Sequence, residues 1–545
     1  MSRGRWFLQE GWAYAWALLA VPVIYGASFP TSRIAWLGWV AFIPWYFAVR
    51  RARTSIALLI CCVSTLLGSY MCTPWLARAV ANYYRQPLAL GVLLFVGVWV
   101  VTISPFVIAF TLCFRQLGRR PSRWLPLLTG AAWAGAELGR ARLFVGDPFG
   151  IFGYSQVGLT SLAQIADVTG VYGLSVLTMA FNAAWAELWL AYAARRRAPL
   201  DTPANTVAHA WQGVGLVLAI LLAVLGYGFG RMRGFDNDQV AGTRIALVQG
   251  NLDLGSQWRQ EFYGRNLEQY MRLTADALRT THPQIVFWPE SAMTFFLEDE
   301  PLYRAALGQL LSPSHTELVA GGARTVDPAQ PRYFNAGFLI APDGHIVAAY
   351  DKQRLLPFAE YFPFGGSSLL RRQFARVREF TPGRAARLLP TAAGLAGVVI
   401  CNEVMFAELV TERVQAGAGY LVTLTNDSWL GDVKYAEEAF DMARMRAVEQ
   451  HRYLVRASTS GPSAIVDPLG RVVTSTANGT RATTAGVIRS SNGLTLYARC
   501  GDAFGVLCAV LPIAVALLGR RRAARQADQS VASASPGKRA ASGAA

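Results

Sequence analysis

The chain has 545 residues, of which 53% are hydrophobic and 16% charged, and its formal net charge at pH 7 is +17. Together with a mean hydropathy of +0.29, this composition excludes an ordinary soluble protein and predicts that a large part of the chain lies in lipid. The excess positive charge is arginine gathered in short clusters beside apolar runs, without interleaved aromatic residues, which argues against nucleic acid as a partner.

Apolar segments of the length needed to cross a bilayer, about 20 residues in a helix, occur at both ends of the chain. Eight candidates cover residues 12–29, 33–49, 55–72, 88–114, 124–139, 170–193, 212–229 and 503–518. The fifth is short and contains Glu137, so a re-entrant or interfacial helix is the alternative there. The sequence therefore predicts a polytopic membrane domain of seven helices over residues 1–230 and an eighth membrane helix over 503–520.

Arginine clusters give the expected orientation, because positive charge near helix ends stays in the cytoplasm. Clusters flank alternate connections between the apolar segments, at Arg3 and Arg5, at Arg50, Arg51 and Arg53, at Arg115, Arg119, Arg120 and Arg123, at Arg195, Arg196 and Arg197, and at Arg520, Arg521, Arg522 and Arg525. Both termini are then cytoplasmic, and residues 231–502 lie outside the cytoplasm, in the periplasm of a bacterium whose inner membrane holds the chain. The tail at 521–545 has no apolar period and is expected to be disordered.

The polar stretch between residues 243 and 495 reads as one α/β domain, because short apolar strand patterns alternate with helical patterns. Strand patterns occur at 244–251, 284–291, 317–323, 333–341, 346–352, 396–403, 420–427 and 453–458, followed by a hairpin over 463–473. Helical patterns cover 257–281, 300–311, 403–416 and 434–452. Strands that are apolar at most positions are buried on both faces, which predicts helices covering a central sheet.

Three of these strands end in a residue that can do chemistry: Glu290, Lys352 and Cys401. Taken singly, each has an ordinary alternative as a salt-bridged carboxylate, a surface lysine or a packed core cysteine. Reactive groups at strand ends tend to converge at one edge of a sheet, so the three together predict an active site.

Cys401 should lie on a turn between a strand and a helix. A helix amino terminus and a nearby Lys352 ammonium would both lower the pKa of its thiol, and the thiolate is the nucleophile. Lys352 could also stabilise an oxyanion, and Glu290 could act as the general base. No histidine or cysteine pair has ligand spacing, so neither a metal nor another cofactor is expected.

The motifs around these residues resemble the catalytic boxes of the nitrilase superfamily: WPES with Glu290, YDKQRLLPFAEYFPFG with Lys352 and Glu360, and ICNE with Cys401. With membrane helices on both sides, the chain is similar to the apolipoprotein N-acyltransferase family of Gram-negative bacteria. The stretches FGYSQ, VQGN, TNDSWLGD, MARMRAVE and LTLYARCGD resemble that family too. The resemblance implies a nitrilase-like αββα sandwich attached to the membrane helices.

The resemblance further implies a reaction in two stages. Cys401 would take a fatty acyl group from a membrane phospholipid, with phosphatidylethanolamine as the expected donor, and form a thioester. The α-amine of the diacylglyceryl-cysteine at the start of an apolipoprotein would then accept the acyl group. A monomer is expected.

The resemblance also assigns auxiliary roles. Glu360 and Glu403 would support the geometry of Lys352 and Cys401. The substrate contacts would be Trp258 and Trp429, which would line the lipid entrance, and Asn402. Asn402 stands where the family often has an aromatic residue, and STSGPS over residues 458–463 also departs from the family pattern.

Other interpretations remain open at this stage. The stretches MTFF over 293–296 and EYFPFG over 360–365 fit either mobile loops that dip into lipid or ordinary core packing. A membrane-anchored amidase would use the same three residues with water as acceptor, and a lipid-binding protein could retain the fold without catalysis. A transporter would require ionisable residues deep in several helices, and the main candidates, Glu137 and Glu187, are too few to build a pathway.

Overall fold

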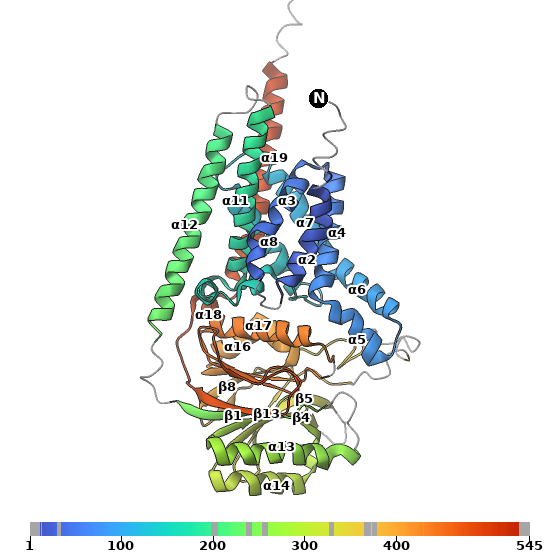
Figure 1. Cartoon of the computed structure of the whole chain (residues 1–545), viewed down its shortest axis with the longest axis vertical. Coiled ribbons are helices and arrows are strands. Elements are labelled where there is room, and N and C mark those ends of the chain that lie inside the picture. Colours follow the sequence, from blue (N-terminus) through green and yellow to red (C-terminus); the bar gives the residue numbers. More distant parts are fainter. Residues whose placement is uncertain are drawn as a thin grey trace, which may run out of the picture.

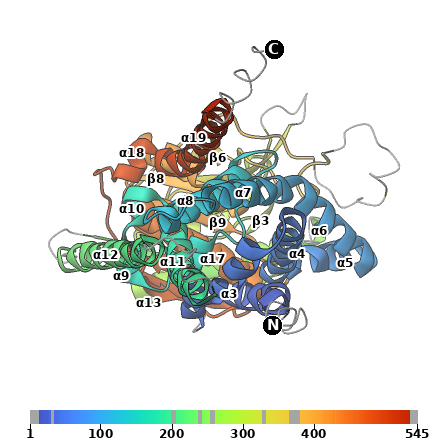
Figure 2. The same ribbon diagram turned by 90° about the horizontal axis from the view of Figure 1, so that it is seen from above.

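The computed structural model describes two connected parts, a helical bundle and an α/β domain (Figure 1). The described residues are 11, 13–29, 34–197, 205–235, 242–252, 260–325, 332–363, 372, 379–428 and 430–533. Seen along the long axis, α12 lies on one flank of the bundle and α5 and α6 on the opposite flank, with α8 and α11 between them (Figure 2).

The helical part consists of long apolar helices joined by short turns. A π-helical turn (Trp16–Ala20) runs into α2 (Val21–Ala27), and the further helices are α3 (Gly38–Arg51), α4 (Thr54–Cys72), α5 (Pro74–Tyr84), α6 (Leu88–Thr102), α7 (Ser104–Leu117), α8 (Leu125–Arg142), α11 (Val171–Arg197), α12 (Asn205–Arg233) and α19 (Ala503–Ser533). Between α8 and α11 lie η3 (Phe152–Gln156), α9 (Thr160–Ala163) and α10 (Ala166–Thr169). Each of the eight predicted segments therefore contains helix.

Four of the described helices are each long and apolar enough to cross a membrane: α4, α11, α12 and the part of α19 from Ala503 to Arg522. The segment predicted as one span over 88–114 is instead the pair α6 and α7, bent by 47°. The bend follows from Pro105 at the start of α7, because proline lacks the N–H that would continue the helix. The total of eight spans stays a prediction.

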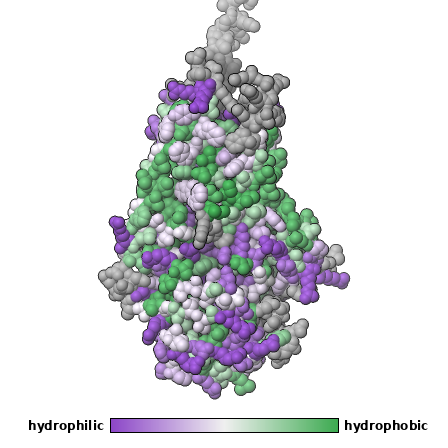
Figure 3. Space-filling model, viewed as in Figure 1, coloured by the Kyte–Doolittle hydropathy of each residue, from purple (hydrophilic) through white to green (hydrophobic). Residues whose placement is uncertain are grey.

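The surface of the helical part is suited to lipid. On the face shown in Figure 3, hydrophobic side chains predominate over the helical part, whereas hydrophilic side chains gather on the α/β part. Leu93 of α6 and Leu222 of α12 are among the most exposed large apolar residues. Helix α19 continues to Ser533, so the first part of the tail that was expected to be disordered is helical; residues 534–545 lie outside the described residues.

The α/β part contains two sheets rather than the one central sheet that the strand pattern predicted, because each sheet is covered by helices on one face and by the other sheet on the opposite face. The first has the order β13-β1-β2-β4-β5-β6, with β3 paired to β4, and the second has the order β12-β11-β10-β9-β8-β7. The strands of the first sheet are β1 (Thr243–Gln249), β2 (Ile285–Phe287), β3 (Met293–Phe296), β4 (Glu317–Thr325), β5 (Tyr333–Ile340), β6 (Ile346–Asp351) and β13 (Ala482–Ile488). Those of the second are β7 (Leu389–Thr391), β8 (Gly394–Ile400), β9 (Tyr420–Thr425), β10 (Leu454–Ser458), β11 (Ala464–Val466) and β12 (Val472–Ser475).

Helices cover the outer face of each sheet, which gives the predicted αββα sandwich (Figure 1). The helices on the first sheet are α13 (Gln260–Thr281) and α14 (Pro301–Leu311), and those on the second are α16 (Ala407–Gln415) and α17 (Val433–Gln450). Apolar side chains such as Leu247, Phe287, Val398 and Val422 fill the space between the sheets. Burial of this surface, at roughly 25 cal/mol per Å², holds the two sheets together.

Helices α16 and α17 also form the contact with the helical part. Met405, Tyr435 and Ala443 belong to the same buried cluster as Ile151 and Tyr154 of the membrane-side segment after α8. The sandwich is thus packed against the bundle through its second sheet and its helices.

One of the two proposed mobile stretches is core. Met293, Thr294 and Phe295 of β3 are buried, and this strand pairs with β4, so the mobile-loop alternative is wrong for MTFF. Of EYFPFG, Glu360 and Phe362 are buried, and the stretch beyond Pro363 lies outside the described residues. Strands β3, β7 and β13 were not predicted from the sequence.

Candidate active site

The three residues at strand ends lie together, between the two sheets. Glu290 follows β2, Lys352 follows β6 and Cys401 follows β8, and their exposed fractions are 6%, 1% and 5%. The Lys352 Nζ lies 3.5 Å from Glu290 Oε1. The convergence predicted from the strand ends is therefore observed, although it draws on two sheets rather than on one edge.

Lys352 is held by a second carboxylate, and an amide joins the two carboxylates. Its Nζ lies 2.8 Å from Glu360 Oε2, and Asn335 Nδ2 donates to Glu290 Oε1 and Glu360 Oε1, both at 2.7 Å. Asn335 lies on β5, opposite the end of β6, where its carbonyl accepts from the Lys352 N–H. Asn335 was not predicted from the sequence, where it stands out only as a single amide within the apolar strand YFNAGFLI.

Glu290 is fixed from the other side as well. The backbone N–H of Asn426, in the turn after β9, donates to Glu290 Oε2 at 2.8 Å. That turn is held by Asp427, which pairs with the buried Arg456 at 2.7 Å and accepts from Ser458 Oγ at 2.6 Å. One carboxylate oxygen thus faces Lys352 and Asn335 while the other is bound to the second sheet.

Cys401 lies on a sharp turn, as predicted. Its φ is +53°, a left-handed conformation that is uncommon for a residue with a side chain, and η6 (Cys401–Met405) starts there. Glu403 supports the turn by accepting from the Ile400 N–H at 2.7 Å. The same carboxylate accepts from the N–H groups of Gln353 and Arg354 at 2.7 and 3.0 Å. Glu403 therefore ties the Cys401 turn to the segment that follows Lys352.

The electrostatics differ from the expectation for the thiol. Burial and the nearby Glu290 raise the pKa of Cys401 to about 12, and Lys352 only partly opposes them. This direction is opposite to the lowering that a helix start and a lysine favour, so Cys401 is protonated and needs a base.

Glu290 and Lys352, the two charged neighbours of the thiol, both have raised pKa values, but for different reasons. Burial raises the pKa of Glu290, and Lys352 opposes it. Burial lowers the pKa of Lys352, but Glu360 and Glu290 more than offset this, so the pKa of the ammonium is raised and it stays charged. A charged lysine beside a carboxylate with a raised pKa is suited to moving a proton to and from a thiol.

Tyr435 of α17 is a further neighbour of the thiol, with its hydroxyl oxygen 3.9 Å from Cys401 Sγ. No sequence signal marks it, because its proximity depends on how α17 docks. Within the described ranges, no group of three or more His, Cys, Asp or Glu side chains is arranged to hold a metal ion.

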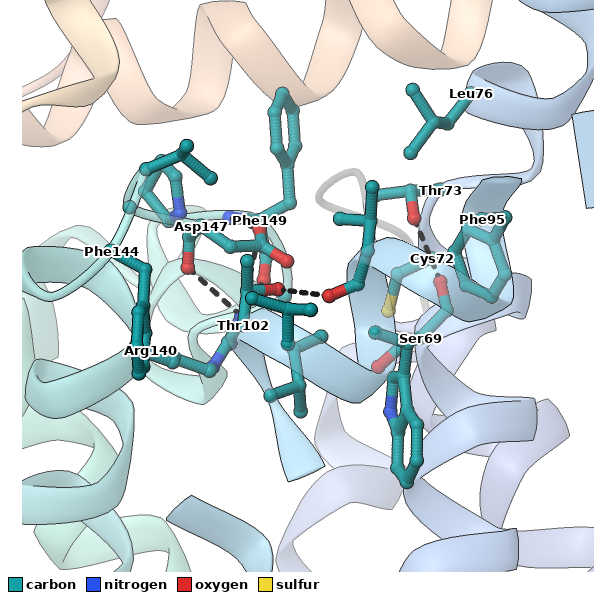
Figure 4. A pocket seen from close by; sticks show the side chains of 18 of the residues that line it. Ser69, Cys72, Thr73, Leu76, Phe95, Thr102, Arg140, Phe144, Asp147 and Phe149 are labelled. Atoms are coloured by element: carbon teal, nitrogen blue, oxygen red, sulfur yellow. Dashed lines mark hydrogen bonds and ion pairs between the residues drawn. The ribbon is translucent and has the colours of Figure 1, made fainter. Parts of the chain in front are cut away.

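A cavity of about 1290 Å³ lies between the helical part and the α/β part, next to this site. Its walls come from α4 to α8, from the segment 144–150 and from the segment 353–363. Asn402 and Tyr435, which are neighbours of Cys401, are among its lining residues. Figure 4 shows Ser69, Cys72 and Thr73 on one side of the space, opposite other lining residues labelled Arg140, Phe144, Asp147 and Phe149. The lining is mostly apolar, which suits an apolar ligand.

The predicted substrate contacts are placed only in part. Asn402 lines the cavity and donates from Nδ2 to the Arg354 carbonyl at 3.3 Å, and its Oδ1 has no hydrogen-bond partner among the described residues. Trp258 and Trp429 lie outside the described residues.

Comparisons with known proteins cover both parts. Residues 244–492 match the family of carbon-nitrogen hydrolases, and residues 22–184 match the apolipoprotein N-acyltransferase N-terminal domain. An apolipoprotein N-acyltransferase of Geobacter metallireducens is 33% identical over 92% of this chain and 94% of its own. One of Bradyrhizobium diazoefficiens is 33% identical over 72% of each chain. Among solved structures, an amidase from Nesterenkonia sp. AN1 matches with a TM-score of 0.36 and 19% identity, over 48% of this chain and 97% of that one.

Proposed function

Because the chain belongs to the apolipoprotein N-acyltransferase family, we propose that Cys401 carries a fatty acyl group, as a thioester, from a membrane phospholipid to the N-terminal amine of a lipoprotein. The chain is an acyltransferase and a bacterial membrane protein by this membership. The observation that carries the proposal is the buried thiol beside Glu290 and Lys352, next to an apolar cavity walled by membrane-side helices.

In the first stage, Cys401 Sγ attacks the ester carbonyl of the phospholipid and its proton passes to the Glu290 carboxylate. The C–S bond forms and the C–O bond to glycerol breaks. Glu290 then returns the proton to the leaving alkoxide, which departs as a lysophospholipid. Lys352 stabilises the oxyanion of the tetrahedral intermediate, and Glu360 holds its ammonium in place at 2.8 Å.

In the second stage, the α-amine of the diacylglyceryl-cysteine attacks the thioester. Glu290 accepts a proton from the amine, the C–N bond forms, and the departing sulfur takes the proton back. The product is an N-acylated lipoprotein, and the free thiol of Cys401 is restored.

Burial supports transfer to an amine over hydrolysis. The three reacting side chains are each at most 6% exposed, so bulk water has little access to a thioester formed there. Both substrates are anchored in the bilayer, each buried methylene contributing about 0.8 kcal/mol, which requires the site to open toward lipid. The cavity between α4 and α8 supplies such a route.

The finer assignments are part of the same proposal. We place the membrane domain at 1–230 and the catalytic domain at 231–502, in the periplasm, with the chain in the inner membrane and both termini in the cytoplasm. The arginine clusters support this orientation. We further propose phosphatidylethanolamine as donor, Trp258 and Trp429 at the lipid entrance, and a monomer as the working form.

The test is intact-protein mass spectrometry of the purified chain after incubation with phosphatidylethanolamine, before and after a diacylated lipopeptide is added. We expect an acyl mass on Cys401 that persists in water and moves to the peptide amine. The adduct should be absent from Cys401→Ala and retained in Cys500→Ala, which removes an exposed cysteine outside the site. An adduct that water clears would indicate a hydrolase, and no adduct on Cys401 would refute the thioester mechanism.

A further inference from the structure

We infer that Tyr435 is a further catalytic residue, whose phenol donates a hydrogen bond to the Cys401 sulfur in both half-reactions. The inference rests on the proposed thioester chemistry and adds to it a donor for the sulfur atom itself. Its basis is the 3.9 Å separation between the Tyr435 hydroxyl oxygen and Cys401 Sγ, together with the way the ring is fixed.

The hydroxyl group has no competing partner. Among the described residues, Cys401 Sγ is the group within hydrogen-bond distance of the Tyr435 hydroxyl. The side chain is buried, yet it lines the large cavity, so it stands where the acyl group must reach the thiol. A buried phenol ordinarily finds a polar partner, and here that partner is the nucleophile.

The backbone of Tyr435 is fixed by the start of its helix. Asp432 caps α17, and its carboxylate accepts from the N–H groups of Lys434 and Tyr435 at 3.0 and 3.4 Å. The Lys434 Nζ donates to the carbonyls of Gly26 and Met71, at 3.0 and 2.6 Å, and these lie at the ends of α2 and α4. The helical part therefore sets the position of Tyr435 over the thiol.

The ring of Tyr435 is held by another residue of the helical part. Trp75 of α5 packs against it edge-on, with ring centroids 4.8 Å apart. The indole N–H of Trp75 donates to Glu438 Oε2 at 3.4 Å, and Glu438 lies one turn after Tyr435 on α17. Trp75 and Glu438 are thus positioning residues, which act on the thiol through Tyr435.

Each of the two half-reactions needs a hydrogen-bond donor at the Cys401 sulfur. Negative charge develops on Sγ when the thiol proton passes to Glu290, and again when the C–S bond breaks during attack by the amine. A hydrogen bond from a neutral donor to a developing anion stabilises that charge without a proton transfer from the phenol. Burial, Cys401 and Asp427 raise the pKa of Tyr435 well above its ordinary value, so the phenol keeps its proton and remains a donor.

The test uses the full-length enzyme with Tyr435→Phe, which keeps the ring against Trp75 and removes only the hydroxyl. Each half-reaction is measured separately by quenched mass spectrometry, as thioester formation from phosphatidylethanolamine and as acyl transfer to a diacylated lipopeptide. We expect each rate to fall by about tenfold or more, the size typical for a hydrogen bond to a charged group. Alkylation of Cys401 by iodoacetamide at pH 8, which needs no lipid, should slow by a similar factor.

A matched control is Tyr420→Phe, which removes a buried hydroxyl bonded to Thr391 Oγ1 at 2.7 Å, at the end of β9 remote from the site. This variant should retain both rates and the alkylation rate. If Tyr435→Phe stays within twofold of the parent in all three measurements, Tyr435 is a packing residue and the inference is overturned. Failure of the parent enzyme to form a thioester would instead refute the proposed function, so the two failures are distinguishable.

Discussion

Asn335 offers a test of how the site keeps Glu290 ready to accept a proton. Its single amide nitrogen donates to Glu290 and to Glu360 at 2.7 Å, and both acceptors are buried. Asn335→Leu removes both bonds and changes the side-chain shape little. A hydrogen bond to a charged group contributes about 1.5 to 3 kcal/mol, and one pKa unit corresponds to about 1.4 kcal/mol. The pKa of Glu290, already raised by burial, should therefore rise by a further one to two units or so.

The direction of the expected change in pH dependence follows from the role of the Glu290 carboxylate. Glu290 accepts the thiol proton only when it is ionised, and Asn335 favours the ionised form, so the variant should lose activity on the acid side first. We expect the acid limb of the profile of kcat/KM against pH to move upward, with a loss about tenfold larger at pH 6 than at pH 8.

The assay is acyl transfer to a lipopeptide between pH 5 and 9, with Asn266→Leu as control. Asn266 is also buried, but it lies on α13 on the outer face of the first sheet, and its Nδ2 has no hydrogen-bond partner among the described residues. An equal loss at every pH, or an equal shift in the control, would refute the argument for Asn335.

Three further substitutions test other parts of the structure. Lys352→Met should abolish thioester formation. Because it leaves two buried carboxylates unpaired, it should also lower the free energy of unfolding by about 3 to 5 kcal/mol, measured by thermal unfolding in detergent. Burial raises the pKa of Glu438 from 4.5 to about 8, so ionising this carboxyl costs stability as the pH rises above 4.5. Glu438→Gln should therefore be more stable than the parent at pH 8, by on the order of 4 kcal/mol, with no gain at pH 4. A gain that is independent of pH would contradict this. Arg456→Met leaves Asp427 charged and unpaired, so it should lower the free energy of unfolding by about 3 to 5 kcal/mol and slow both half-reactions. An unchanged melting temperature would show that the pair is dispensable.

The sequence alone determined the parts of this protein that depend on local pattern. Apolar length marked the helices, and alternation of strand and helix patterns marked an α/β domain, whose αββα form came from the family resemblance. Glu290, Lys352 and Cys401 were found because each stands where an apolar strand ends. The bend between α6 and α7 also had a local signal, Pro105, although the segment was predicted as one span.

The tertiary structure alone decided that three further residues contact this group. Asn335, Asn426 and Tyr435 come from β5, the turn after β9 and α17, and nothing local to them indicates that they meet Glu290 or the thiol. The pKa of Cys401 is likewise raised, whereas a helix start and a lysine by themselves would lower it. Desolvation and a facing carboxylate depend on what packs around the thiol, and that packing brings together strands of two sheets and helix α17, which lie far apart in the chain.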